Sequence, residues 1–193
     1  MARKQTTSMG QIRIIGGRWR GRKLPVIDTD GLRPTTDRLK ETAFNWLQFE
    51  LAGARVLDLF AGTGSLGIEA LSRGASHAMF FEKDLKATQQ LKENLARLDA
   101  LKTSHIQQGD TLKLLNEAPA GGPFNLVFID PPFHKNLLHT AVAMLVEHSW
   151  LASGARVYVE TELEVELNVP NNWQLYREKK MGQSYARLFH VAN

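Results

Sequence analysis

Apolar positions along the chain follow two periods, one typical of buried strands and one typical of amphipathic helices. After residue 53, short runs rich in β-branched and aromatic residues alternate with segments that carry an apolar residue every three or four positions. Such alternation favours an α/β fold with a parallel sheet and helices on both faces. The predicted strands span residues 55–60, 77–81, 103–107, 124–129 and 155–160.

Helices are predicted between these strands. The first runs through residues 68–71 and ends at Gly74, and the second spans residues 84–98 with four leucines turned inward. A short helix to residue 116 and another over residues 136–147 follow. The four inward leucines are Leu85, Leu91, Leu95 and Leu98.

Neither end of the chain follows this alternation of strands and helices. Residues 173–179 and 184–191 are strand-like runs around Met181-Gly182-Gln183, which predicts an antiparallel hairpin at the far edge of the sheet. Residues 11–15 and 18–24 flank Gly16-Gly17 and predict a second hairpin near the start of the chain.

One further amphipathic helix is predicted between that first hairpin and the sheet. Thr35 or Thr36 can cap it, and the preceding loop with Arg33 lies at a helix N-terminus, where anions are favoured. The loop is either only a cap or part of a binding site. The apolar stripe of this helix consists of Leu39, Ala43, Trp46 and Leu47.

Positive charge is concentrated at the start of the chain. Residues 1–24 contain seven of the 24 Lys and Arg residues and none of the 20 acids. The rest of the chain therefore carries a net negative charge, although the formal net charge of the whole chain is +4. This asymmetry is the pattern expected for phosphate contacts. A solvated basic tail with Trp19 as its hydrophobic anchor is the alternative. The predicted RNA-binding residues are Arg13, Arg18, Arg20, Arg22 and Lys23.

Composition excludes several classes of protein. The 193 residues suit one domain, and 43% hydrophobic content can fill its core. The absence of cysteine excludes disulfides and thiolate metal sites, and the six histidines are scattered, so no metal is expected. We find neither a run of eighteen apolar residues nor a signal-peptide pattern, and we expect a cytoplasmic protein.

A glycine-rich loop follows the first predicted strand of the sheet. Gly62, Gly64 and Gly67 satisfy the dinucleotide-binding spacing, and Glu82 follows at the end of the next strand, where an acid can accept hydrogen bonds from a ribose. Asp58, just before the loop, would repel a pyrophosphate but could bind an amino-acid ammonium. A cofactor with an amino acid, a ribose and an adenine but no phosphate fits best, which predicts S-adenosylmethionine.

A second loop follows the strand over residues 124–129. Pro131 and Pro132 lack backbone N–H groups, so the chain must leave the sheet directly after Asp130. The Asp130 carboxylate and the Pro131 carbonyl can accept hydrogen bonds from an exocyclic amino group, which makes its nitrogen more nucleophilic. Phe133 could stack on the base. An ordinary Asp-Pro turn is the alternative.

These segments together resemble a known family. The segment over residues 58–64 resembles the first motif of class I methyltransferases, and that over residues 130–133 resembles their amino-methylating motif. The fuller pattern, with residues 13–22, 32–38 and 158–160, is similar to the bacterial small-subunit rRNA (guanine-N2)-methyltransferase D family.

The resemblance implies a Rossmann-like fold with a seven-stranded, mostly parallel sheet. It also implies transfer of one methyl group to N2 of a guanine in 16S rRNA, within an assembled or assembling small subunit, by a protein expected to be a monomer. We expect residues 1–10 to be disordered, residues 11–30 to form the basic hairpin and residues 31–193 to form the catalytic domain.

The resemblance also assigns roles to residues. Asp110 would hold the adenine amino group, Glu82 the ribose and Asp58 the methionine end, although Asp110 could merely cap a helix and Asp58 could tie down the glycine turn. Glu160 is expected to be a structural acid at a strand end. The predicted catalytic residues are Asp130, Pro131, Pro132 and Phe133. The predicted cofactor-binding residues are Asp58, Phe60, Ala61, Gly62, Gly64, Glu82, Asp110, Arg33 and Thr35.

Three other functions remain compatible with the motifs. An adenine-N6 methyltransferase would use the same two loops. An NAD-dependent oxidoreductase would use the glycine loop alone. A non-catalytic RNA-binding or assembly factor would not need the Asp130 carboxylate.

Overall fold

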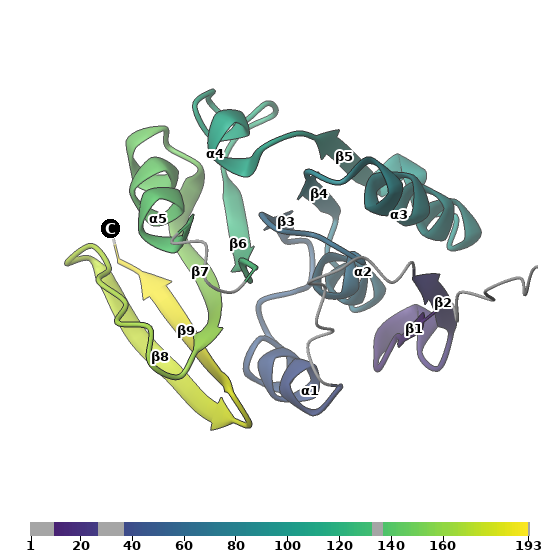
Figure 1. Ribbon diagram of the computed structural model, residues 1–193, viewed down its shortest axis with the longest axis horizontal. Coiled ribbons are helices and arrows are strands. Elements are labelled where there is room, and N and C mark those ends of the chain that lie inside the picture. The colour runs from purple at the N-terminus through teal and green to yellow at the C-terminus, as the bar shows by residue number, and fades with distance from the viewer. Residues whose placement is uncertain (1–9, 27–36, 133–136, 193) are drawn as a thin grey trace, which may run out of the picture.

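The computed structural model describes residues 10–26, 37–132 and 137–192. Their main feature is a seven-stranded sheet with the strand order β5-β4-β3-β6-β7-β9-β8 (Figure 1). The pairs among β5, β4, β3, β6 and β7 are parallel, whereas β9 is antiparallel to both β7 and β8, as predicted. The strands are β3 (Arg55–Asp58), β4 (His77–Glu82), β5 (Ser104–Gln108), β6 (Phe124–Ile129), β7 (Leu151–Glu162), β8 (Trp173–Met181) and β9 (Ser184–Val191).

Helices cover both faces of the sheet because alternate strand residues bury apolar side chains on each side. One core joins the sheet to α1 (Asp37–Trp46), α2 (Ser65–Ser72) and α3 (Leu85–Arg97). The other core joins it to α4 (Thr111–Leu114) and α5 (Leu137–Glu147). No helix in the described ranges is long and apolar enough to cross a membrane.

Strand β7 and the side chain of Leu85 differ from the sequence prediction. Strand β7 begins at Leu151, four residues earlier than predicted, and its pairing with β6 shifts register between Phe124 and Leu126. Leu85 was predicted to face inward but is 70% exposed. It is the first residue of α3, directly after the Asp84 N-cap, and therefore lies outside the leucine stripe that packs on the sheet.

The two strands of the N-terminal hairpin are shorter than predicted. Strand β1 (Gly10–Arg13) pairs with β2 (Lys23–Val26), and a 3-10 turn, η1 (Gly17–Trp19), lies between them. The prediction that the second strand starts at residue 18 was therefore wrong, and the arginines do not alternate along a strand.

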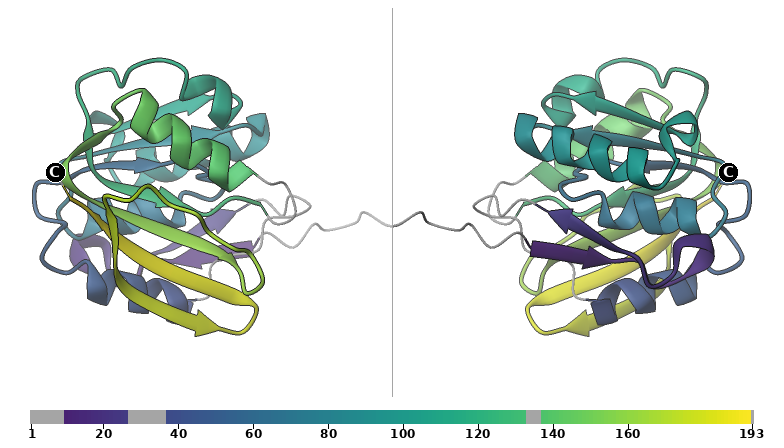
Figure 2. Two further views of the ribbon diagram at one scale, coloured as in Figure 1. Left: turned by 90° about the vertical axis from the view of Figure 1, so that its left-hand side faces the viewer. Right: turned by 90° about the vertical axis from the view of Figure 1, so that its right-hand side faces the viewer.

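Contacts with helix α2 explain this irregular connection. Gly17 has φ +73°, and a Cβ there would lie 1.9 Å from the Ser72 carbonyl oxygen, so only glycine permits this close approach. The backbone N–H of Trp19 donates to Ser72 Oγ at 3.0 Å, and the indole is buried. Figure 2 shows the hairpin running alongside α2.

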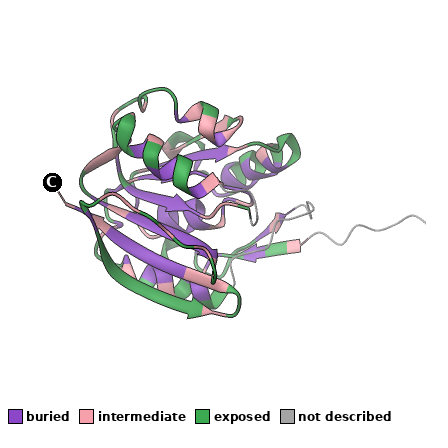
Figure 3. Ribbon diagram, turned by 60° about the vertical axis from the view of Figure 1, so that its left-hand side comes forward, coloured by how far each residue is buried: buried purple, intermediate pink, exposed green. Residues whose placement is uncertain are grey.

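Strand β8 forms the exposed edge of the sheet. After Trp173, the residues through Lys180 are exposed on both faces (Figure 3). Helix α1 packs against β9, the neighbouring strand. The charged residues Arg177, Glu178, Lys179 and Lys180 therefore face solvent, which suits an edge strand that must avoid pairing with other chains.

Candidate functional site

The candidate site lies at the carboxyl edge of the parallel strands. Strands β3 and β6 are neighbours, and the chain continues from β3 toward β4 and β5 but from β6 toward β7, on the other side. Such a point of reversal is where α/β sheets bind ligands, because the loops that leave the two strands diverge there. The glycine loop leaves β3 and the Asp130 loop leaves β6, so the two predicted motifs meet at this point.

Asp58, the last residue of β3, is 2% exposed. Its Oδ2 accepts a hydrogen bond from the Gly67 N–H in the first turn of α2, at 3.0 Å. Burial raises the pKa of the Asp58 carboxyl to about 7, against the lowering effect of this hydrogen bond. The bond supports the alternative that Asp58 ties down the glycine turn. The raised pKa indicates that the hydrogen bonds to this carboxylate do not offset its desolvation. A cation bound beside it would therefore stabilise the ionised form.

The glycine loop is held by backbone hydrogen bonds and by Glu82. The Gly62 N–H donates to Glu82 Oε2 at 2.7 Å, and the Asp84 N–H donates to Glu82 Oε1 at 2.7 Å. Gly64 has φ +76° and its Cα faces Leu91, which a Cβ would meet at 2.3 Å. Glu82 thus shapes the loop, and the remaining lone pairs of its carboxylate can still accept from a ribose.

Phe60 and Ala61 lie between Asp58 and the glycines, as the motif requires. Ala61 is buried and its N–H donates to the Phe81 carbonyl at 2.9 Å, whereas Phe60 is half-buried. The loop therefore crosses from β3 over the end of β4. This crossing brings the predicted cofactor residues of both strands together.

Asp110 lies at the end of the next strand, in the N-cap position of α4. No cap hydrogen bond is formed, but after the larger effect of Lys83 the backbone N–H groups of Lys113 and Leu112 also lower the pKa of Asp110, so the structure stays compatible with a capping role. Lys83 Nζ donates to Asp110 Oδ2 at 3.0 Å, and this hydrogen bond lowers the pKa of the carboxyl. Asp110 is thus near Glu82 in space, with its carboxylate ionised and partly exposed.

Asp130 directly follows the last residue of β6. Asp130 and Pro131 are half-buried and Pro132 is exposed, so the chain leaves the sheet here as predicted. The predicted stacking residue Phe133 lies outside the described residues. The same holds for Arg33 and Thr35 in the loop before α1.

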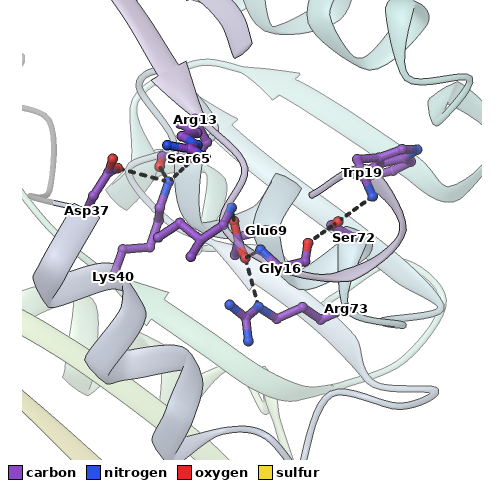
Figure 4. Close-up of polar contacts among 10 residues, drawn as sticks. Arg13, Gly16, Trp19, Asp37, Lys40, Ser65, Glu69, Ser72 and Arg73 are labelled. Atoms are coloured by element: carbon purple, nitrogen blue, oxygen red, sulfur yellow. Dashed lines mark hydrogen bonds and ion pairs between the residues drawn. The ribbon is translucent and has the colours of Figure 1, made fainter. Parts of the chain in front are cut away.

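The N-terminal hairpin is attached to α1 and α2 by buried polar contacts (Figure 4). Glu69, 1% exposed, accepts from the N–H groups of Ile15 (2.8 Å) and Gly16 (2.7 Å) and from Arg73 Nε (2.7 Å). Lys40, 2% exposed, donates to the Arg13 carbonyl at 2.7 Å and to Ser65 Oγ at 3.1 Å. These contacts fix the hairpin relative to the glycine loop.

The predicted RNA-binding residues occupy two positions along this hairpin. Arg13 and Lys23 pair near the start of α2, where Ser65 follows the glycine loop. Arg18 and Arg20 flank Trp19 in the turn that contacts Ser72 at the other end of α2, and Arg22 follows this turn, with its carbonyl accepting from the Ile14 N–H. All five side chains are exposed, although Arg18 stacks on Trp19 at 4.0 Å and Arg22 donates to the Arg97 carbonyl.

The sequence analysis did not predict that Lys40, Glu69 and Ser72 would attach the hairpin to α1 and α2. The signal was present, because Lys40 lies one turn before Ala43 and Phe44 on the apolar face of α1. Glu69 is likewise the single charged residue in the otherwise apolar or small-residue segment of α2. A charge on a buried stripe requires a partner, but the sequence does not say which one. Within the described ranges, no three His, Asp or Glu residues form a group that could hold a metal.

Comparison with known proteins places the chain in a family. A family model described as Conserved hypothetical protein 95 matches residues 12–190. Ribosomal RNA small subunit methyltransferase D of Escherichia coli strain K12 is 50% identical over 98% of this chain and 94% of its own length. The protein of that name from Haemophilus influenzae is 46% identical over 93% of this chain and 94% of its own length.

Solved structures agree with the fold. The structure of an Escherichia coli protein is 49% identical, with a TM-score of 0.86, and the match covers 95% of this chain and 99% of that one. An RNA methyltransferase from Salinibacter ruber, solved in complex with S-adenosyl-L-homocysteine, shares the fold at 14% identity and a TM-score of 0.64, covering 83% of this chain and 94% of that one. The chain therefore belongs to the ribosomal RNA small subunit methyltransferase D family and is a methyltransferase, which confirms the family that its motifs predicted.

Proposed function

We propose that this protein transfers a methyl group from S-adenosylmethionine to the exocyclic N2 of a guanine in 16S rRNA of the small ribosomal subunit. The observation that carries the proposal is the meeting of two loops at the point of reversal in the sheet. One loop contains the buried Asp58 carboxylate and the glycines, and the other contains Asp130-Pro131-Pro132. The relatives that match over nearly their full length are named for a small-subunit rRNA methyltransferase.

The residues of the first loop fit this cofactor. Asp58 is buried with a pKa raised to about 7, so an ammonium group beside it would stabilise the ionised carboxylate. Gly62 and Gly64 allow a ligand to approach the loop backbone, Glu82 would accept from ribose hydroxyls, and Asp110 would accept from the adenine amino group. When bound, the cofactor supplies an electrophilic methyl group on a sulfonium.

The residues of the second loop suit the amino group of a base. The Asp130 carboxylate and the Pro131 carbonyl would accept hydrogen bonds from its two N–H groups and hold the nitrogen with its lone pair toward the cofactor. Transfer would then be direct and in line, with the enzyme contributing positioning and electrostatic preorganisation. Phe133 is proposed to stack on the target base.

The basic hairpin is proposed to contact the phosphates of the rRNA. Arg13, Arg18, Arg20, Arg22 and Lys23 are all exposed on a hairpin that polar contacts fix beside the glycine loop. The substrate would be an assembled or assembling small ribosomal subunit in the cytoplasm. The protein would bind it as a monomer.

Identification of the methylated nucleoside tests the proposal. The protein is incubated with labelled S-adenosylmethionine and, separately, with unmodified small subunits, naked 16S rRNA and DNA. The products are then digested and separated. We expect label in N2-methylguanosine from the small subunits. Label in N6-methyladenine, or binding of NAD in place of the methyl donor, would contradict the proposal.

A further inference from the structure

Glu160 is the neighbour of Asp130 across the sheet. Strands β6 and β7 are parallel, with Phe128 opposite Tyr158 and Ile129 opposite Val159, so the next residues along are Asp130 and Glu160. Side chains two residues apart on a strand share a face, and adjacent strands are about 4.8 Å apart. The two carboxylates therefore project from the same face of the sheet, side by side at its carboxyl edge.

An aromatic layer supports this pair. The Tyr158 hydroxyl donates to Glu160 Oε2 at 3.2 Å, and the Tyr158 ring packs edge-on against Phe128 with the ring centroids 5.9 Å apart. Burial, followed by the negative charges of Glu160 and Asp130, raises the pKa of the Tyr158 phenol well above its ordinary value. The phenol thus stays protonated and fixes the orientation of the Glu160 carboxylate, which is itself only 4% exposed.

A base that presents adjacent N–H donors to this edge could hydrogen-bond to both carboxylates, because a carboxylate accepts at both of its oxygens. The pair lies on the far side of β6 from the glycine loop, where the target base of the proposed reaction would be held rather than the cofactor. This location places Glu160 beside the proposed target base, whereas the sequence analysis gave Glu160 only a structural role.

We propose that Glu160 accepts a hydrogen bond from N1–H of the target guanine while Asp130 accepts from its N2 amino group, so that Glu160 selects guanine. The assignment rests on the proposed function and names its specificity-determining residue. Guanine carries adjacent donors at N1 and N2 on one edge. Adenine presents a bare N1 lone pair next to its N6 amino group, and a carboxylate at position 160 repels that lone pair.

The test compares guanine with 2-aminopurine, which keeps the N2 amino group but has an acceptor at N1. The methylated position is first located in small subunits treated with the wild-type protein. Small subunits are then assembled on 16S rRNA prepared by splinted ligation, with guanine or 2-aminopurine at that position. The ratio of kcat/KM for the two bases is measured for the wild type and for Glu160→Gln. 2-Aminopurine also lacks the O6 of guanine. This difference affects the wild type and the variant equally, so it cancels when their guanine-to-2-aminopurine ratios are compared.

We expect the wild type to prefer guanine by about 100-fold or more, because the analogue leaves a buried carboxylate facing an acceptor. The side-chain amide that Glu160→Gln introduces can donate to an N1 acceptor. This variant should therefore reduce the preference by at least about tenfold, chiefly by losing rate on guanine. Glu160→Asp keeps the charge and should keep the preference while slowing transfer to both bases.

Two readouts separate this role from a structural one. Thermal unfolding and calorimetric cofactor binding show whether each variant is folded. If Glu160 has only a structural role, Glu160→Gln should slow methyl transfer to guanine and to 2-aminopurine by the same factor. An unchanged ratio in the folded variant would overturn the assignment, as would a wild type that accepts both bases equally. Absence of guanine methylation by the wild type would instead overturn the proposed function itself.

Discussion

Lys40 Nζ lies 3.1 Å from Ser65 Oγ, and the same ammonium donates to the Arg13 carbonyl at 2.7 Å. Ser65 is the first residue of α2, directly after the glycine loop, and Arg13 ends the first strand of the basic hairpin. One buried lysine therefore joins the proposed RNA-binding element to the proposed cofactor loop. Desolvation lowers the pKa of this lysine, and the negative charges of Glu69 and Asp37 oppose that effect.

Lys40→Met should test this link. The substitution keeps the volume of the side chain but leaves the Arg13 carbonyl and Ser65 Oγ without their charged donor. We expect a loss of about 2–3 kcal/mol in the free energy of unfolding and a Tm lower by roughly 4–12 °C. Urea and thermal unfolding measure both quantities. Lys86→Met, at an exposed position of α3, is the control and should change neither, and equal stability of the two variants would refute the link.

Glu69→Gln should release the hairpin from α2. The Glu69 carboxylate accepts from two backbone N–H groups and from Arg73 Nε, and an amide cannot accept all three. We expect a stability loss of about 3 kcal/mol. Trypsin should also cleave the hairpin at least about tenfold faster, because cleavage follows local opening. Glu93→Gln on the exposed side of α3 is the matched control, and equal cleavage rates would show that other contacts hold the hairpin.

Asp58 should make the stability depend on pH. Its pKa is raised from 3.8 to about 7 in the folded protein, so between these values folding retains a proton that the unfolded chain has lost. Stability should therefore fall as the pH rises through this window, by roughly 4 kcal/mol in total, and the loss is complete above pH 7. Asp58→Asn removes this loss and should be more stable than the wild type at pH 8. Urea unfolding at several pH values measures the difference.

Cofactor binding supplies the control for Asp58. A ligand ammonium favours the ionised carboxylate, so the affinity of the wild type for S-adenosylmethionine should rise between pH 6 and pH 7, by up to about tenfold. Asp58→Asn should bind weakly and without this pH dependence. Calorimetric titrations that show the same pH dependence for both proteins would assign the ionisation to another group.

Asp130→Ala should remove catalysis while leaving the cofactor site intact. Asp130 directly follows β6, and the proposed cofactor residues lie on the loops that follow β3, β4 and β5. We expect single-turnover methyl transfer at saturating cofactor to fall by roughly 100- to 1,000-fold, with little change in cofactor affinity. Glu117→Ala, at an exposed position beyond α4, should transfer at the normal rate. Near-normal transfer by Asp130→Ala would make the loop structural.

The sequence predicted the parts of this molecule that local patterns determine. Runs of apolar residues located the strands of the sheet, and two prolines located the point at which the chain leaves β6 after Asp130. Asp58 and Glu82 could be placed at the same edge because each ends a strand of a parallel sheet. These inferences need only the strand period and the direction of the chain.

The remaining features depend on contacts between distant residues. The strand predicted from residue 18 is interrupted because Gly17 and Trp19 pack on Ser72, more than fifty residues away. The pairing of Asp130 with Glu160 requires the register between β6 and β7, and the register shift between Phe124 and Leu126 cannot be read from either strand alone. Composition and periodicity carry no information about such pairings.

The basic hairpin should contribute salt-dependent affinity for the substrate. Arg18 and Arg20 flank Trp19 at the end of α2 opposite the glycine loop, about 12 Å away for a helix of eight residues, and Arg22 follows them along the chain. They would therefore meet phosphates beyond the target nucleotide. Replacing all three with Gln should weaken binding to small subunits while leaving cofactor binding unchanged.

The salt dependence of binding decides whether these arginines contact phosphates directly. Each phosphate contact contributes a slope near −0.7 in a plot of log affinity against log salt for single strands, so the triple variant should lose about two units of slope. Replacing Arg177, Lys179 and Lys180 on β8 with Gln removes the same charge from another exposed strand and should change the slope less. Equal slopes for the wild type and the hairpin variant would show that the hairpin only packs on the body through Ile14 and Trp19, with its arginines solvated.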